Sequence, residues 1–189
     1  MKLSQDEIKE LRELKTNLDS DEIRIKEIIK KKLLENNKII YVLNNKELQD
    51  ADAEVDDYYG INILPYYIIN QTQTNVKNYI CYEVGCDEIN DDNKVVKYMQ
   101  ITFYILCDQK NIIEESTYIA RHDLLAALII NQFNWTNYFG QRIHCISNKP
   151  SVVDTDYACR TLIFEQITDN SLVKTRNRIP MTVNKEVRI

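Results

Sequence analysis

The stretch from Asn78 to Thr168 constrains the fold of this chain more than any other part of the sequence. Its pattern of apolar and polar residues predicts five elements in the order strand, strand, helix, strand, strand: Tyr79–Cys86, Val95–Cys107, Ile113–Phe133, Ile143–Ser147 and Tyr157–Ile167. Successive strands joined by short polar connections pair antiparallel, and a long amphipathic helix covers one face of such a sheet. We therefore expect an α+β fold with a mostly antiparallel sheet and one long helix packed on a face.

The second predicted strand indicates how the two faces of the sheet differ. Met99, Ile101 and Phe103 share one face, whereas Tyr98 and Tyr104 share the other. The chain has 12 Tyr but only 4 Phe and 1 Trp, and a tyrosine ring on a surface combines apolar area with a hydrogen-bonding hydroxyl. We expect a tyrosine-bearing surface that suits contact with another protein. The alternative is that these tyrosines only occupy solvent-facing strand positions.

The two ends of the chain extend beyond this core. A capping box from Ser4 to Glu7 predicts a helix with an apolar stripe, and a second helix start near Asp19 predicts either two helices or one kinked helix. A short isolated helix is marginal in water, so the first piece needs a partner surface on its own domain or on a neighbouring subunit. Lys38–Leu43 is predicted to be a short strand. These patterns divide the chain into an N-terminal helical segment, a core domain and an extended, mildly basic C-terminal arm: residues 1–36, 37–168 and 169–189.

Composition narrows the classes of protein to which the chain can belong. Apolar residues make up 44% and charged residues 28% of the chain, which is typical of a globular domain. The apolar runs are far shorter than the roughly 20 residues that span a bilayer, and the start of the chain lacks a signal-peptide pattern, so we expect a cytoplasmic protein without membrane contact. A net charge of −5 argues against general binding to nucleic-acid phosphates. The 5 cysteines, without a CxxC pair, indicate reduced thiols in the core.

Two clusters of residues have side chains of the types that bind metal ions. The acidic residues from Asp50 to Asp57 resemble a calcium loop, but Val55 stands where the loop needs glycine and Ile61 where it needs glutamate. The cysteines and histidine with zinc-binding chemistry fit no known ligand spacing: Cys81, Cys86, His144 and Cys145. We therefore expect a solvated acidic loop and packed cysteines, with no bound metal and no cofactor.

Residues suited to catalysis do not converge in the sequence. Arg121, His122 and Asp123 are consecutive in a predicted helix, so they point in different directions and are expected to form a polar strip on its solvent side. A divalent-dependent nuclease remains an alternative through Asp154 and Glu165, although the position that should hold lysine is Ile167 in this chain. We expect no catalytic residues.

Charge and facing instead indicate surfaces for assembly. The acidic loop and the exposed tyrosines are candidates, and the basic C-terminal arm of one copy is expected to lie on the acidic loop of the next. The alternative for the arm is a disordered tail. The candidate subunit-interface residues are Asp50, Asp52, Glu54, Asp56, Tyr98, Tyr104, Lys174, Arg176 and Arg178.

The order of elements resembles the head–tail joining and tail-terminator proteins of tailed bacteriophages. The resemblance covers Pro65 to Thr168 and lies in the strand VVKYMQITFYILC, the helix EESTYIARHDLLAALIINQF and the strands IHCIS and YACRTLIFEQIT. It implies a non-enzymatic virion protein, assembled in the host cytoplasm, that forms a ring of commonly six copies at the head–tail junction. Such a ring caps the tail tube and joins neighbouring head-completion and tail-tube proteins, while DNA passes through without specific binding.

The sequence is also compatible with other functions. One is a different head–tail connector, adaptor or tail-associated structural protein. Another class is a small cytoplasmic nuclease, and a further one is a regulatory binding module that is monomeric or dimeric. The long N-terminal helical segment and the C-terminal arm go beyond the minimal pattern of the tail-terminator family.

Overall fold

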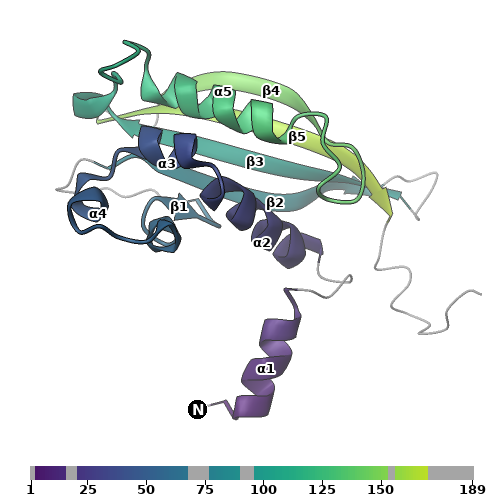
Figure 1. Ribbon diagram of the computed structural model, residues 1–189. Helices are drawn as coiled ribbons and strands as arrows, with labels where there is room; N and C mark the ends of the chain where they lie inside the picture. Colours follow the sequence, from purple (N-terminus) through teal and green to yellow (C-terminus); the bar gives the residue numbers. More distant parts are fainter. Residues whose placement is uncertain (1–2, 16–20, 68–76, 90–95, 153–155, 170–189) are drawn as a thin grey trace, which may run out of the picture.

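A mixed five-stranded sheet with helices on one face forms the body of the protein in the computed structural model (Figure 1). The structure describes residues 3–15, 21–67, 77–89, 96–152 and 156–169. Its helices are α1 (Gln5–Glu13), α2 (Asp21–Leu34), α3 (Asn37–Leu43), α4 (Lys46–Asp50), α5 (Arg121–Phe133) and the short 3₁₀ helices η1 (Val55–Tyr58) and η2 (Gln109–Asn111). Its strands are β1 (Ile63–Leu64), β2 (Tyr79–Ile89), β3 (Val96–Asp108), β4 (His144–Val152) and β5 (Tyr157–Asp169). The predicted α+β class is confirmed.

The sheet has the strand order β1-β2-β3-β5-β4. Only β1 pairs parallel, with β2, and the other neighbours are antiparallel. Along β3 buried and half-buried residues alternate from Val96 to Ile105, as the sequence pattern predicts. Strand β1 is short, because only Ile63 and Leu64 pair with β2.

The main core lies between the sheet and helices α2, α3 and α5. Phe103 stands at its centre, with ring centroids at 5.5 Å from Phe133 of α5 and at 5.7 Å and 6.1 Å from Phe164 and Tyr82 of the neighbouring strands. Each of these side chains is at most 1% exposed. Fully burying one such ring contributes on the order of 1.5–3 kcal/mol, so this aromatic group fixes α5 on the sheet.

Three buried asparagines join the core helices to the sheet. The Asn45 amide donates to Asn62 Oδ1 at 2.7 Å, and the Asn62 amide donates to the Asn78 carbonyl oxygen at 2.8 Å. Asn78 in turn donates to the Leu43 carbonyl oxygen at 2.9 Å and accepts from the Asp108 backbone N–H at 3.2 Å. These bonds satisfy polar groups inside the protein and tie the end of α3 to the end of β3.

The predicted strand over Lys38–Leu43 is wrong, because these residues form helix α3. The Asn36 side chain caps the helix by accepting from the backbone N–H groups of Lys38 and Ile39, and Asn44 ends it in the left-handed region at φ 48°. These caps and the burial of apolar side chains at helical spacing override the strand preference of the β-branched residues.

The predicted long helix is correct only in its second half. Residues 113–120 form a loop closed by a bridge between Ile113 and Ala120, and α5 begins at Arg121. Strand β4 is longer than predicted and runs through Pro150, which the edge of a sheet tolerates. Glu114 caps this loop by accepting from the backbone N–H groups of Ser116 and Thr117.

The two N-terminal helices differ in how they relate to the body. Helix α2 places Ile25, Ile29 and Leu33 in the main core, whereas α1 buries none of its residues. The predicted division at residue 36 stays a prediction, but the core includes α2. Residues 170–189 of the predicted C-terminal arm lie outside the described residues.

Candidate assembly surfaces

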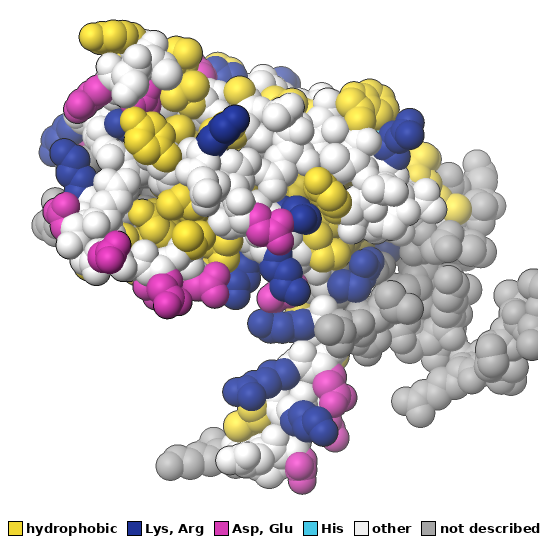
Figure 2. Space-filling view, in the orientation of Figure 1, with side chains coloured by type: hydrophobic (Ala, Val, Ile, Leu, Met, Phe, Trp, Pro, Cys, Tyr) yellow, Lys and Arg dark blue, Asp and Glu magenta, His cyan; other side chains and the backbone are white. Residues whose placement is uncertain are grey.

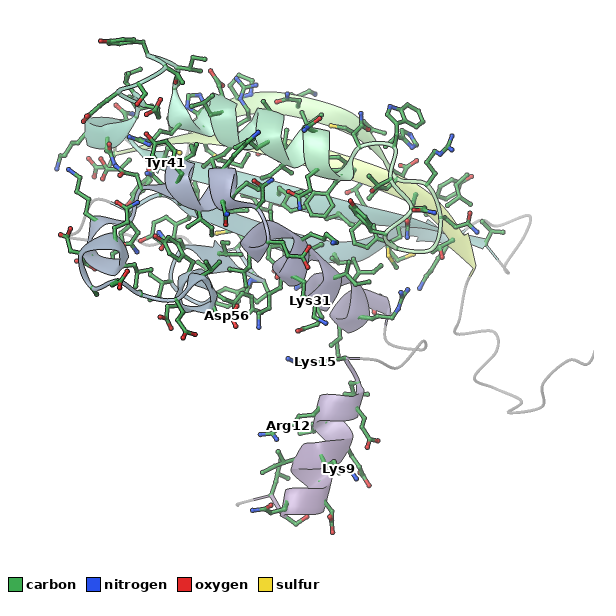
Figure 3. The ribbon with its side chains drawn as sticks, viewed as in Figure 1. Lys9, Arg12, Lys15, Lys31, Tyr41 and Asp56 are labelled. Atoms are coloured by element: carbon green, nitrogen blue, oxygen red, sulfur yellow. The ribbon has the colours of Figure 1, made fainter. Side chains whose placement is uncertain are left out.

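The acidic segment from Asp50 to Asp57 lies on the body at the α4–η1 side. Asp50, Asp52, Glu54 and Asp56 are all exposed, as expected for a solvated loop. Figure 2 shows acidic side chains gathered on this side of the molecule, and Figure 3 labels Asp56 among them. The local turn is held by a hydrogen bond from the Glu54 backbone N–H to the Asp57 carboxylate at 3.0 Å.

The described part of the chain holds no group of three or more histidine, cysteine or acidic side chains placed to bind a metal ion. Cys81 and His144 occupy sheet positions that face away from the helices, whereas Cys145 pairs opposite Phe164 on the helical face. His144 and Cys145 therefore point to opposite faces of the sheet, as adjacent strand residues do. The acidic segment is then a charged surface without a metal-binding arrangement among the described residues.

Tyr98 and Tyr104 lie on the sheet face opposite the helices, as predicted. Both are half-buried, and the Tyr104 ring packs against Tyr67 with ring centroids 4.5 Å apart. A second, smaller apolar cluster lies on this face around Tyr104: Leu64, Tyr79, Cys81, Leu106, Tyr157 and Cys159. Ile167 pairs opposite Tyr98 in β5 and is 54% exposed, so the open part of this face lies near the start of β3.

The structure does not bring the sequence-predicted site residues onto one surface. Tyr98 lies ten residues before Asp108, and this distance along a strand is roughly 33 Å. Asp108 is bonded to Asn78 at the end of the sheet that the α3–α4 connection covers. The acidic segment and Tyr98 therefore form separate patches. Lys174, Arg176 and Arg178 lie outside the described residues.

Helix α1 projects from the body (Figure 1), and its apolar side chains are exposed. Its predicted capping box is confirmed, because Ser4 Oγ accepts from the Glu7 backbone N–H at 3.3 Å and Glu7 accepts from the Ser4 N–H at 2.7 Å. Ile8 and Leu11 are 38% and 55% exposed. An ion pair of 3.2 Å from Lys15 to Glu27 joins the helix to α2.

A preformed loop between η2 and α5 presents a second exposed apolar group, which sequence reasoning missed. Glu114, 2% exposed, accepts hydrogen bonds from the backbone N–H groups of Ser116 at 3.0 Å and Thr117 at 2.7 Å, and from the Tyr41 hydroxyl at 3.0 Å. Hydrogen bonding, chiefly from the Ser116 N–H, lowers the pKa of Glu114 to about 2. The loop holds Tyr118 at φ 57° with 83% of its surface exposed.

A groove runs along α5 beside the edge strand β4. It has a volume of about 660 Å³, and its lining comes from α5, the following turn, β4 and β5: Asp123, Ala126, Ala127, Ile130, Asn131, Asn134, Trp135, Asn148 and Arg160. Arg160 pairs with Asp123 at 2.5 Å and donates to Asn148 at 2.8 Å. Trp135 is 64% exposed and stacks on His144 with ring centroids 5.6 Å apart.

The predicted polar strip on the solvent side of the helix is wrong for Arg121. This side chain is 4% exposed and donates to the backbone oxygens of Val42 at 3.2 Å and Asn111 at 3.0 Å. It therefore holds α3 and the η2 turn against the start of α5. His122 is half-buried, and burial lowers its pKa below the ordinary value.

The cysteines near these residues are held as thiols. Burial raises the pKa of Cys107, and it also raises that of Cys145, whose Sγ donates to the Ser147 carbonyl oxygen at 3.3 Å. Because the thiolate is the reactive form, this environment does not activate either cysteine as a nucleophile.

None of the described helices is long and apolar enough to cross a membrane.

Comparison with known proteins places this fold in a family. No curated protein matches the chain. The YomW family model matches residues 36–166, from the N-cap of α3 at Asn36 to Gln166 near the end of strand β5. The family name resembles that of a protein from a Bacillus phage region, which suggests a phage-associated protein. Because the match covers more than half of its length, the chain belongs to the YomW family.

Proposed function

We propose that this chain is a non-enzymatic structural protein of a tailed-phage virion that forms an oligomeric ring at the head–tail junction. In this role it caps the tail tube and joins it to the head, as a tail terminator does. The family supports an association with phages, and the order of elements resembles that of tail terminators and head–tail joining proteins.

The observation that carries this proposal is the exposed apolar stripe of α1. A nine-residue helix is too short to be stable alone in water, and α1 buries none of its residues against the body. Its apolar side chains need a second surface, and assembly with other copies supplies one. Tyr118 and Trp135 add exposed aromatic area of the kind that is enriched at protein interfaces.

A ring also needs two different patches on each copy. Head-to-tail contacts close into a ring when each copy offers a surface and its complement at separate places. The acidic segment, the Tyr98 face of the sheet and the α5 groove are separate surfaces on this chain. Asp50, Asp52, Glu54 and Asp56 remain candidate interface residues on this basis, and Tyr98 and Tyr104 remain candidates on the sheet.

The test measures assembly first and position in the virion second. Light scattering of the purified protein over a range of concentrations, followed by negative-stain imaging, should show closed rings of commonly six copies. Immunogold labelling of phage particles should then mark the junction between head and tail, and particles made without the protein should have unjoined heads and tails of uncontrolled length. A protein that stays monomeric and is absent from virions would contradict the proposal.

Control measurements separate the rival functions. Labelling along the tail rather than at the neck would favour a tail-associated structural role. Cleavage of DNA that requires a divalent cation and is lost in Glu165→Gln would favour a nuclease, whereas intact DNA is the expected result.

A further inference from the structure

We propose that α1 of one copy docks in the α5 groove of a second copy, so that the N-terminal helix is the connecting arm of the assembly. This inference rests on the proposed ring and names one of its contacts. The ring could exist without this contact, and the experiment below distinguishes the two failures.

The two surfaces are complementary in size. Nine residues of α1 span about 14 Å, and the groove follows α5 from Asp123 to Trp135, a distance of roughly 18 Å at 1.5 Å per residue. Its volume of about 660 Å³ has room for several side chains. Ala126 and Ala127 in its lining let a second helix approach α5 closely, as helix packing requires.

The two surfaces also match in chemistry. Ile8 and Leu11 of α1 and its C-cap residue Leu14 recur at helical spacing, in the pattern by which a short amphipathic helix anchors in an apolar groove. Ile130 and the exposed Trp135 give the groove apolar area to receive them. The same groove offers polar amides at its rim, where a bound helix would present its charged residues.

Charges at the two surfaces are compatible. At 100° per residue, Arg12 borders the apolar stripe of α1 on one side and Glu10 on the other. The groove lining contains the half-buried ion pair of Asp123 and Arg160, whose side chains are 43% and 20% exposed. A docked α1 therefore offers Arg12 to the Asp123 carboxylate and Glu10 to the Arg160 guanidinium, so that opposite charges meet.

The arrangement of the chain favours docking on a second copy. Figure 1 shows α2 and α3 between α1 and α5, so the arm and the groove lie on different sides of the same molecule. Contacts of this kind repeat from copy to copy in a head-to-tail manner. Each copy donates one arm and receives one.

The experiment combines variants of both surfaces with matched controls. Ile8→Asp with Leu11→Asp places charges in the apolar stripe, and Ala127→Arg fills the groove from an exposed position. Lys9→Gln with Glu13→Gln changes the opposite side of α1 at constant net charge, and Gln109→Arg adds the same side chain at an exposed position of η2. The midpoint concentration of assembly should rise roughly a hundredfold in the first two proteins and stay unchanged in the controls.

A cross-link identifies the occupant of the groove directly. A photoreactive benzoylphenylalanine at position 11 is activated in an equal mixture of isotopically heavy and light protein, and the products are mapped by mass spectrometry. Heavy-to-light cross-links to residues 123–135 are the expected result. Cross-links within one copy, or to another surface, overturn the inference.

The outcomes separate this contact from the ring itself. If wild-type protein forms rings and both surface variants do so equally well, the arm–groove contact is wrong and the ring stands. If wild-type protein forms no assembly and no cross-link joins two copies, both the ring and the contact are wrong.

Discussion

Tyr118 and Trp135 stand just beyond opposite ends of α5, and both hold left-handed backbone, at φ 57° and 63°. They expose 83% and 64% of their surface. A bulky residue in this region of backbone space costs on the order of 1 kcal/mol. The backbone at these two positions therefore lowers the stability of the protein, and both positions also expose an aromatic ring to solvent. This combination is the pattern expected of contact residues.

Replacing Tyr118 with glycine should separate stability from assembly. We expect the free energy of unfolding of Tyr118→Gly to be unchanged or up to about 1 kcal/mol higher, because glycine adopts this backbone without strain. Assembly of the oligomeric ring should weaken, since the exposed aromatic side chain of Tyr118 is lost. Urea denaturation and light scattering on the same samples measure both quantities.

The control for this substitution is an exposed tyrosine with ordinary backbone. Tyr66 is 50% exposed and is not among the residues with positive φ. Tyr66→Gly should lower the free energy of unfolding, because glycine there gains freedom in the unfolded chain without relieving strain. Equal losses of stability in the two variants would show that the φ of Tyr118 is not strained.

Replacing Asn62 should destabilise the whole protein. Its side chain accepts from Asn45 at 2.7 Å and donates to the Asn78 carbonyl oxygen at 2.8 Å, and the residue is 0% exposed. Asn62→Ala leaves two buried polar partners unsatisfied, at a cost of about 2–4 kcal/mol. Chemical denaturation should show this loss, whereas Asn131→Ala, at an exposed position, should lie within about 0.5 kcal/mol of wild type.

The sheet could be predicted from the sequence because each strand carries its own signal. Alternation along Val96 to Ile105 reports the two faces of β3 without help from distant residues. The amphipathic pattern of α1 and its Ser4 cap are equally local. Such features depend on neighbours in the chain, and these were predicted correctly.

Features decided by tertiary contacts could not be predicted in the same way. Residues 113–120 have helical apolar spacing, but Glu114 closes them into a loop through hydrogen bonds that include the distant Tyr41. Arg121 looked like a solvent-facing charge because its acceptor, the Val42 carbonyl oxygen, lies 79 residues away. The α5 groove likewise requires β4 and β5 to be placed beside the helix, which the sequence alone does not specify.

Acid should weaken the loop that carries Tyr118. The carboxylate of Glu114 has a pKa lowered to about 2 in the folded protein, from about 4.5 when unfolded. The stabilisation by this carboxylate is therefore complete above pH 4.5 and is lost as the pH falls toward 2. Hydrogen exchange of the Ser116 and Thr117 amides, measured across this range, should show protection falling with pH.

Glu114→Gln supplies the comparison for this pH dependence. The glutamine side chain cannot hold the three donors as the carboxylate does. The backbone amides of Ser116 and Thr117 should therefore be less protected from exchange at neutral pH, and their protection should vary little between pH 4.5 and 2. Glu115→Gln, at the exposed neighbouring position, should behave like wild type. Protection that is independent of pH in wild-type protein would contradict the assigned role of Glu114.

Neutralising the acidic segment should test whether it is a subunit contact. Asp50→Asn with Asp56→Asn removes two exposed carboxylates and should change the free energy of unfolding by less than about 0.5 kcal/mol. If the segment meets basic residues of another copy, wild-type assembly should weaken as salt rises, and the variant should assemble more weakly and depend less on salt. Glu35→Gln with Glu115→Gln removes the same net charge elsewhere and should retain the wild-type salt dependence. Analytical ultracentrifugation at low and high salt distinguishes these results, because a general effect of net charge would change both double variants alike, whereas a local contact changes only the first.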